Sequence, residues 1–151
     1  MEMNEDLKLL RFYFVLLAIF TIGRWGLSLG GADYEATHQV FSIVILTMLS
    51  SAYYGGFVRR FLGSGVKRAM VLGLWIGFSA QLIVFGSTAI SYLAGMDTFF
   101  NHPRALNLPE MPSFGDAMVI RLQGILGNTI FNALAAALGY AIGGVIPQDV
   151  Q

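Results

Sequence analysis

Four long apolar stretches dominate this sequence and limit what it can fold into. Each contains roughly the 20 predominantly apolar residues that are needed to cross about 30 Å of hydrocarbon, and they cover residues 9–29, 40–58, 70–93 and 118–142. The second and third contain no charged residue. A helix pairs its backbone polar groups internally, so it is the form that such a segment takes in lipid. The sequence therefore predicts an all-α, polytopic membrane protein with a four-transmembrane-helix bundle.

The composition agrees with a membrane protein of one domain. Charged residues make up 12% of the 151 residues, against about 25% in soluble domains, and hydrophobic residues make up 56%. The formal net charge is zero, which argues against a nucleic-acid partner. Cysteine is absent, which excludes disulfides, thiolate catalysis and cysteine-ligated metal centres. Membrane lipids are the partners that the composition itself predicts.

Basic residues in the short connecting segments predict the orientation. Cytoplasmic loops carry an excess of lysine and arginine, and the segment 59–68 holds four of them in ten positions. The segments 30–39 and 95–117 hold only Arg104 among several acidic residues. We therefore expect a multi-pass protein of the cytoplasmic or plasma membrane, with both termini in the cytoplasm. The segment 95–117 then forms a long outer loop, and residues 9–29 form a retained first span.

Small residues at helical spacing indicate which helix faces pack together. In lipid, helices associate through close packing rather than through the hydrophobic effect, so small residues gather at their interfaces. Residues three or four positions apart lie on one face of a helix. In the third and fourth stretches the residues that follow such a spacing are Gly73, Gly77, Gly124, Asn128, Asn132, Gly139 and Gly143. We expect these faces to pack within one bundle or, in part, against a second copy or another membrane subunit.

Two arginines lie inside the apolar stretches. Arg24 precedes the outer end of the first span by about five residues, and Arg121 follows the outer start of the fourth by about three. Arginine within a span is costly, so it usually reaches toward the headgroups or faces the bundle. One interpretation is that both reach the membrane surface and pair with acidic residues of the outer loops. The other is an anion-binding site for a lipid phosphate or a carboxylate, which the planar guanidinium suits.

An internal repeat contains the only two histidines. Residues 31–38 and 95–102 both read G-x-D-x-x-x-x-H, and each follows an outward-directed span. Such a repeat predicts two similar helical hairpins, as in the parallel repeats of some transporters. Two carboxylates and two imidazoles on one side suit a divalent metal, which makes the candidate metal ligands Asp33, His38, Asp97 and His102. The alternative is ordinary turn chemistry, since glycine and aspartate commonly end helices and form turns.

The sequence offers packing surfaces but no coherent catalytic set. The HExxH, GxSxG, Walker and GxGxxG motifs are absent, so the sequence leaves the catalytic residues and cofactors undetermined, and the divalent metal just described is the one cofactor that it suggests. The leading hypothesis is a non-catalytic integral membrane subunit that packs into a homo-oligomer or a larger membrane complex. The alternatives are a small oligomeric transporter or channel, and a membrane enzyme with a metal- or anion-binding site on its outer face.

Overall fold

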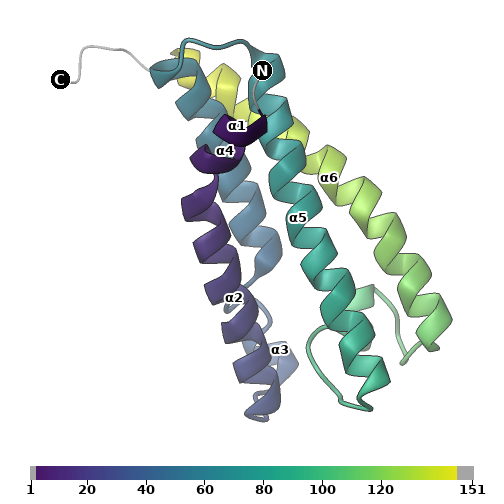
Figure 1. Cartoon of the computed structure of the whole chain (residues 1–151). Coiled ribbons are helices and arrows are strands. Elements are labelled where there is room, and N and C mark those ends of the chain that lie inside the picture. Colours follow the sequence, from purple (N-terminus) through teal and green to yellow (C-terminus); the bar gives the residue numbers. More distant parts are fainter. Residues whose placement is uncertain (1–2, 146–151) are drawn as a thin grey trace.

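The computed structural model describes residues 3–145, and every regular element in this range is a helix. Figure 1 shows α1, the α4–α5 turn and the last turns of α6 at one end of the molecule, which we call the α1 end. It shows α3 at the opposite end, which we call the α3 end. The elements are α1 (Met3–Leu9), α2 (Arg11–Leu29), α3 (Tyr34–Thr37), α4 (Ile43–Phe61), α5 (Val66–Leu93), η1 (Pro103–Leu106) and α6 (Phe114–Val145).

Three of these helices, α2, α5 and α6, are long and apolar enough to cross a membrane. They correspond to the first, third and fourth predicted spans, so the prediction of apolar helices of spanning length is confirmed for these three. α5 and α6 begin before the apolar stretches predicted as spans, at Val66 and Phe114, because the polar residues that precede these stretches are already helical. The region between α5 and α6 is correspondingly shorter than the predicted loop, and it contains the short helix η1.

α4 differs from the predicted second span. Residues 40–42 are not helical, because the chain turns at Phe41, whose φ of 53° is a left-handed value. The helix starts at Ile43, and its last turn holds Arg59 and Arg60. α4 therefore contains fewer apolar residues than the predicted span. It is not one of the three helices that are long and apolar enough to cross a membrane.

α4 and α6 meet backbone to backbone from the middle of α4 toward the α1 end. A Cβ atom added to Gly139 of α6 would collide with the carbonyl group of Ala52 on α4. One added to Gly143 would lie 3.0 Å from the Cα atom of Gly56. Because the neighbouring atoms belong to the backbone, they cannot rotate away. The α4–α6 interface therefore depends on glycine, as close helix contacts in membranes generally do.

α5 and α6 approach each other equally closely. A Cβ atom on Gly73 would lie 2.5 Å from the carbonyl oxygen of Asn132, and one on Gly77 would lie 2.8 Å from the Cα atom of Thr129. The side chain of Asn132 also accepts a hydrogen bond of 2.8 Å from the hydroxyl of Ser51 on α4, with both residues buried. α6 is thus the helix on which α4 and α5 both pack.

α2 packs through large side chains. The Tyr13 hydroxyl donates to the carbonyl of Ile76 at 2.8 Å, and the Trp25 indole donates to the Ser87 hydroxyl at 3.2 Å. Leu17, on the same face of α2 as Tyr13, is also buried. The backbones of α2 and α4 consequently lie farther apart than those of α5 and α6. The two predicted hairpins therefore differ in the way their helices pack.

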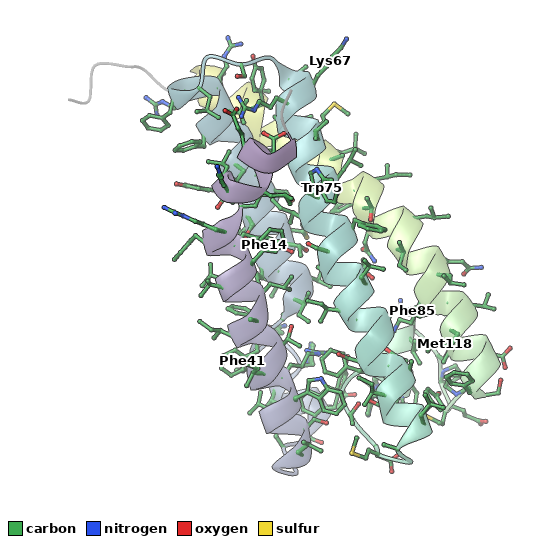
Figure 2. The ribbon with its side chains drawn as sticks, in the orientation of Figure 1. Phe14, Phe41, Lys67, Trp75, Phe85 and Met118 are labelled. Carbon is green, nitrogen blue, oxygen red and sulfur yellow. The ribbon has the colours of Figure 1, made fainter. Side chains whose placement is uncertain are left out.

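A buried ion pair attaches α1 to the start of α5. The side chain of Asp6 is 2% exposed, and its Oδ1 accepts a hydrogen bond of 3.0 Å from Nε of Arg68 and lies 3.0 Å from Nη2 of the same guanidinium. Arg68 also donates to Ser64 in the α4–α5 turn. The neighbouring Lys67 projects away from the molecule at this end (Figure 2). Arg68 therefore connects α1 with the start of α5 and with the turn that precedes it.

We expect Gly139→Leu to destabilise the protein much more than Gly127→Leu. A side chain at position 139 must displace the backbone of α4, and overpacking of this kind typically costs about 1–3 kcal/mol or more. A Cβ atom at Gly127 of the same helix meets nothing within 4 Å. Thermal denaturation in mild detergent measures the difference. Equal melting temperatures for the two variants would show that α4 and α6 do not meet as described.

The ion pair of α1 gives a second stability prediction. Asp6→Asn should lower the free energy of unfolding by about 1–3 kcal/mol, because Arg68 loses its buried charged partner but keeps partial access to water. Glu5→Gln is the matched control: its carboxylate is 63% exposed and 4.0 Å from Arg68, so the change should stay within about 0.5 kcal/mol. Denaturation of both variants in detergent checks this, and a larger loss for Glu5→Gln would contradict it.

Candidate functional site

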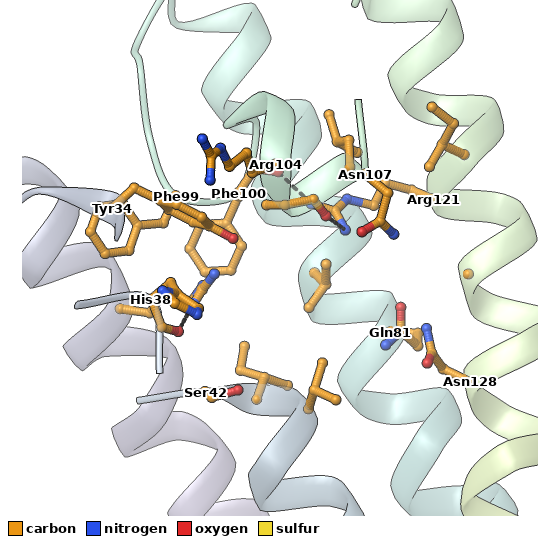
Figure 3. A pocket seen from close by; sticks show the side chains of 18 residues that line it. Tyr34, His38, Ser42, Gln81, Phe99, Phe100, Arg104, Asn107, Arg121 and Asn128 are labelled. Atoms are coloured by element: carbon orange, nitrogen blue, oxygen red, sulfur yellow. Dashed lines mark hydrogen bonds between the residues drawn. The ribbon is translucent and has the colours of Figure 1, made fainter. Parts of the chain in front are cut away.

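A cavity of about 510 Å³ lies between the helices toward the α3 end (Figure 3). Its wall is formed by side chains of α2, α4, α5 and α6 together with the connecting segments that carry α3 and η1. We call it the arginine cavity, because Arg24 and Arg121 both line it. Its volume is within the range of roughly 300–1,000 Å³ that is usual for ligand pockets.

The arginine cavity occupies the space that opens where α4 and α6 separate. The two helices are joined by the Ser51–Asn132 hydrogen bond, and nearer the α3 end the lining comes from the first turn of α4 and from residues 120–128 of α6. Gly124 helps to leave this space open, since a Cβ atom there would meet only the Gln81 side chain at 3.5 Å and the Asn128 side chain at 3.6 Å.

The residues that were predicted to pack helices therefore fall into two groups. Those at close backbone contacts or in the buried hydrogen bond are Gly73, Gly77, Asn132, Gly139 and Gly143. Gly124 and Asn128 line the arginine cavity, and Asn128 also lies against Gly77 through its backbone carbonyl. All of them follow the same helical spacing, so the separation of α4 from α6 is what distinguishes the two groups.

Arg121 of α6 is held by three hydrogen bonds. Its Nε donates to the Thr88 hydroxyl on α5 at 3.0 Å. Its two terminal nitrogens donate to backbone carbonyls of the α5–α6 connection, Nη1 to Ala105 at 3.3 Å and Nη2 to Phe100 at 2.5 Å. The same Thr88 hydroxyl donates to the Phe100 carbonyl at 3.0 Å. Arg121 thus fixes the connecting segment to both helices that it joins.

Arg24 of α2 is held mainly by aromatic rings. Its Nη1 donates to the carbonyl of His38 at 3.1 Å. Its Cζ atom lies 5.5 Å from the ring centroid of Phe99, 5.7 Å from that of Phe100 and 6.0 Å from that of Tyr34. These distances are within the range of cation–π attraction. Ring faces and a carbonyl oxygen carry partial negative charge, so they offset the guanidinium charge only in part.

The charge of the arginine cavity is positive. Among the described residues, neither Arg24 nor Arg121 lies within ion-pair distance of a carboxylate, and no aspartate or glutamate lines the cavity. A third lining arginine, Arg104, is paired with Glu35 at 2.9 Å. One interpretation of the sequence was that Arg24 and Arg121 pair with acidic residues of the outer loops. In the part of the chain that the structure describes, neither arginine makes such a pair.

The glycines of the sequence repeat mark two helix ends of one type. α2 and α5 are both followed by a glycine in the left-handed region, with φ of 75° at Gly31 and 63° at Gly95. The residue after each glycine donates to the carbonyl five positions back, Ala32 at 3.0 Å and Met96 at 2.9 Å. This is the Schellman pattern of helix termination. Turn chemistry therefore accounts for the glycines of the repeat.

Beyond the glycines the two copies of the repeat differ. Asp33 caps α3 by accepting a hydrogen bond from the backbone of Ala36 at 2.9 Å. Asp33, Asp97 and His102 line a separate hollow at the α3 end, whereas His38 lines the arginine cavity. Within residues 3–145, no three histidine, aspartate or glutamate side chains gather closely enough to hold a metal ion. The arrangement thus gives the predicted metal site no support.

Sequence reasoning missed the groups that hold the two arginines. These groups are backbone carbonyls and aromatic rings in the connecting segments, and helical periodicity does not describe the course of such segments. The available signal was the adjacent pair Phe99–Phe100, because aromatic residues beside arginines without acidic neighbours favour cation–π contacts.

The comparisons with known proteins do not assign this geometry to a family. No protein-family model matches the chain, and no curated protein or solved structure matches it significantly. The arginine cavity is therefore interpreted from its own residues.

Proposed function

We propose that this chain is a four-span membrane protein that binds an anionic ligand, through a phosphate or carboxylate group, in the arginine cavity. One observation carries the proposal: Arg24 and Arg121 line the same cavity without an ion-pair partner among the described residues. An anion between them would offset both charges. The planar guanidinium matches phosphate and carboxylate oxygens. The amides of Gln81 and Asn128, which also line the cavity, add hydrogen-bonding groups.

The packing of α4 supports its assignment as the fourth span. α4 lies against both α5 and α6, so it follows these helices into the hydrocarbon if they cross a membrane. Its buried face includes Leu46 and Val58, while Ile45, Leu49 and Tyr53 on another face are 45%, 67% and 63% exposed. Large apolar side chains exposed along a whole helix face suit lipid better than water.

The distribution of charge supports the proposed orientation. The α4–α5 turn and the helix ends that flank it carry four basic residues, at the end where α1 lies: Arg59, Arg60, Lys67 and Arg68. The connections at the α3 end carry one basic residue, Arg104, beside the acidic residues Asp33, Glu35, Asp97 and Glu110. By the positive-inside rule, the α1 end lies in the cytoplasm and the arginine cavity lies in the outer half of the membrane.

The subunit hypothesis has less support than binding of an anion. It was based on small-residue helix faces, and the glycines at Gly73, Gly77, Gly139 and Gly143 meet backbone atoms of this same chain. The outward face of α6 instead carries large side chains such as Leu126, Leu134 and Leu138, which are 56–69% exposed. Lipid covers such a face adequately, so a homo-oligomer or a larger complex stays a prediction.

The orientation can be tested by labelling single cysteines in this cysteine-free chain. Cysteine at Ser64, in the α4–α5 turn, should react with a membrane-impermeant maleimide only after the cells are permeabilised. Cysteine at Glu110, an exposed residue of the α5–α6 connection, should react in intact cells. Reaction of both positions from one side would contradict four spans with this orientation.

Removal of either arginine charge should weaken anion binding. The probes are inorganic phosphate and dihexanoyl phosphatidic acid, added to the protein in mild detergent, with binding measured by calorimetry. We expect the wild-type protein to bind at least one probe, and Arg24→Gln and Arg121→Gln to weaken that binding at least about tenfold, since a charged hydrogen bond contributes roughly 1.5–3 kcal/mol.

The matched control is Arg11→Gln, which removes an exposed arginine from the opposite end of α2 and should leave the affinity unchanged. Arg121 also anchors the α5–α6 connection, so the melting temperature of each variant is measured beside its affinity. Arg24 donates a single backbone-directed hydrogen bond, which makes Arg24→Gln the cleaner variant. Wild-type affinity in a folded Arg24→Gln protein would overturn the proposed function.

A further inference from the structure

We infer that the anion is the headgroup of a membrane lipid with a terminal phosphate monoester, which enters the arginine cavity sideways from the bilayer between α4 and α6. This inference rests on the proposed function, because it identifies the ligand class and the route of access for the same site. Four features of the cavity carry it: its cover at the α3 end, its opening between two helices, its size and its charge.

The cover at the α3 end is a packed segment. Phe99, Phe100 and Leu106 lie within it and are only 4%, 1% and 3% exposed. The Phe99 backbone donates to the Ser28 hydroxyl of α2 at 2.9 Å, and Arg121 binds two carbonyls of the segment from α6. The segment therefore connects α2 with α6 across the end of the cavity that faces water in the proposed orientation.

Contacts between α3 and η1 add to this cover. Glu35 of α3 pairs with Arg104 of η1 at 2.9 Å. The ring of Tyr34 stacks on that of His102, with centroids 4.0 Å apart and an interplanar angle of 8°. Figure 3 shows Arg104 and Asn107 on one side of the cavity and Ser42 at the start of α4 on the other. These contacts narrow the cavity on the aqueous side, where the lining residues Arg104 and Asn107 are exposed.

The opening between α4 and α6 faces a different environment. Beyond the Ser51–Asn132 hydrogen bond, the facing wall residues of the two helices include Val44 on α4 and Ile120 on α6. Val44 is 52% exposed, and Gly124 next along α6 contributes no side chain. In the proposed orientation this apolar border lies in the outer half of the bilayer, beside the acyl chains. A lipid headgroup can pass here while its chains stay in hydrocarbon.

The size and charge of the cavity fit the headgroup. About 510 Å³ accommodates a phosphate and a glycerol backbone but not two long acyl chains, which therefore remain outside, between α4 and α6. A phosphate monoester carries roughly −1.5 to −2 charges at neutral pH, and Arg24 and Arg121 supply two positive charges. A zwitterionic headgroup would bring its own cation into a cavity that has no lining carboxylate to receive it.

The inference can be tested with two probes of the same phosphate chemistry. The protein is placed in phosphatidylcholine nanodiscs, and native mass spectrometry measures retention of dioleoyl phosphatidic acid; glycerol 3-phosphate is the soluble competitor. The wild-type protein should retain the lipid, and glycerol 3-phosphate should bind at least about tenfold more weakly, because it cannot place chains between α4 and α6. Val44→Trp should narrow the opening and reduce lipid retention at least about tenfold, which is a larger reduction than it causes in glycerol 3-phosphate binding.

Ile45→Trp is the matched control, because Ile45 is 45% exposed on the same turn of α4 but does not line the cavity. Ile120→Trp, on the other side of the opening, provides a second variant if Val44→Trp does not fold. Lipid loss in Val44→Trp or Ile120→Trp but not in Ile45→Trp supports the inference. Equal affinity for the two probes, with both insensitive to the folded opening variants, would overturn lateral entry of a lipid and leave the anion site intact. Probe binding that survives Arg24→Gln would overturn the site itself.

Discussion

The close contact of α6 with its two neighbours determines the form of this protein. Gly73 and Gly77 keep α5 beside α6, and Gly139 and Gly143 bring α4 onto the same helix from its middle toward the α1 end. Three helices can meet at backbone distance over a limited length only, because each crosses the others at an angle. α4 and α6 therefore separate toward the α3 end, and the arginine cavity lies where they separate. The glycine contacts nearer the α1 end thus place the candidate site nearer the α3 end.

The two arginines are the costly groups in this arrangement. A guanidinium at membrane depth loses hydration, and the contacts that replace it are hydroxyl and carbonyl oxygens around Arg121 and aromatic rings around Arg24. These contacts provide hydrogen bonds and partial charges, and they also attach the α5–α6 connection to the helix bundle. They do not supply a full negative charge, so both net charges remain in a cavity that is large enough for a ligand.

Much of the fold followed from the sequence, because long apolar stretches in lipid can form little other than helices. The start of α4 did not, since it depends on the turn at Phe41, where the left-handed backbone is not signalled by glycine. The spacing of small residues also could not separate Gly139, at a backbone contact, from Gly124, on the cavity wall. That difference arises from the angle between helices, which is set by all of their contacts together. For the repeat, the alternative of turn chemistry accounts for its two glycines, whereas the predicted metal site required its acidic and histidine residues to lie together, and they take different places.

The presence of both arginines on one cavity argues for a ligand more strongly than either does alone. The hydrogen bonds do not by themselves require a charge, since neutral side-chain donors also bond to backbone carbonyls, and the cation–π contacts of Arg24 offset its charge only in part. Two like charges that share a low-dielectric space also repel each other, which disfavours their placement on the same wall. The local contacts therefore hold these two side chains in place and leave much of their charge uncompensated. An anion bound between them would convert that repulsion into attraction, and it would do so only if both residues face the same space, as Arg24 and Arg121 do.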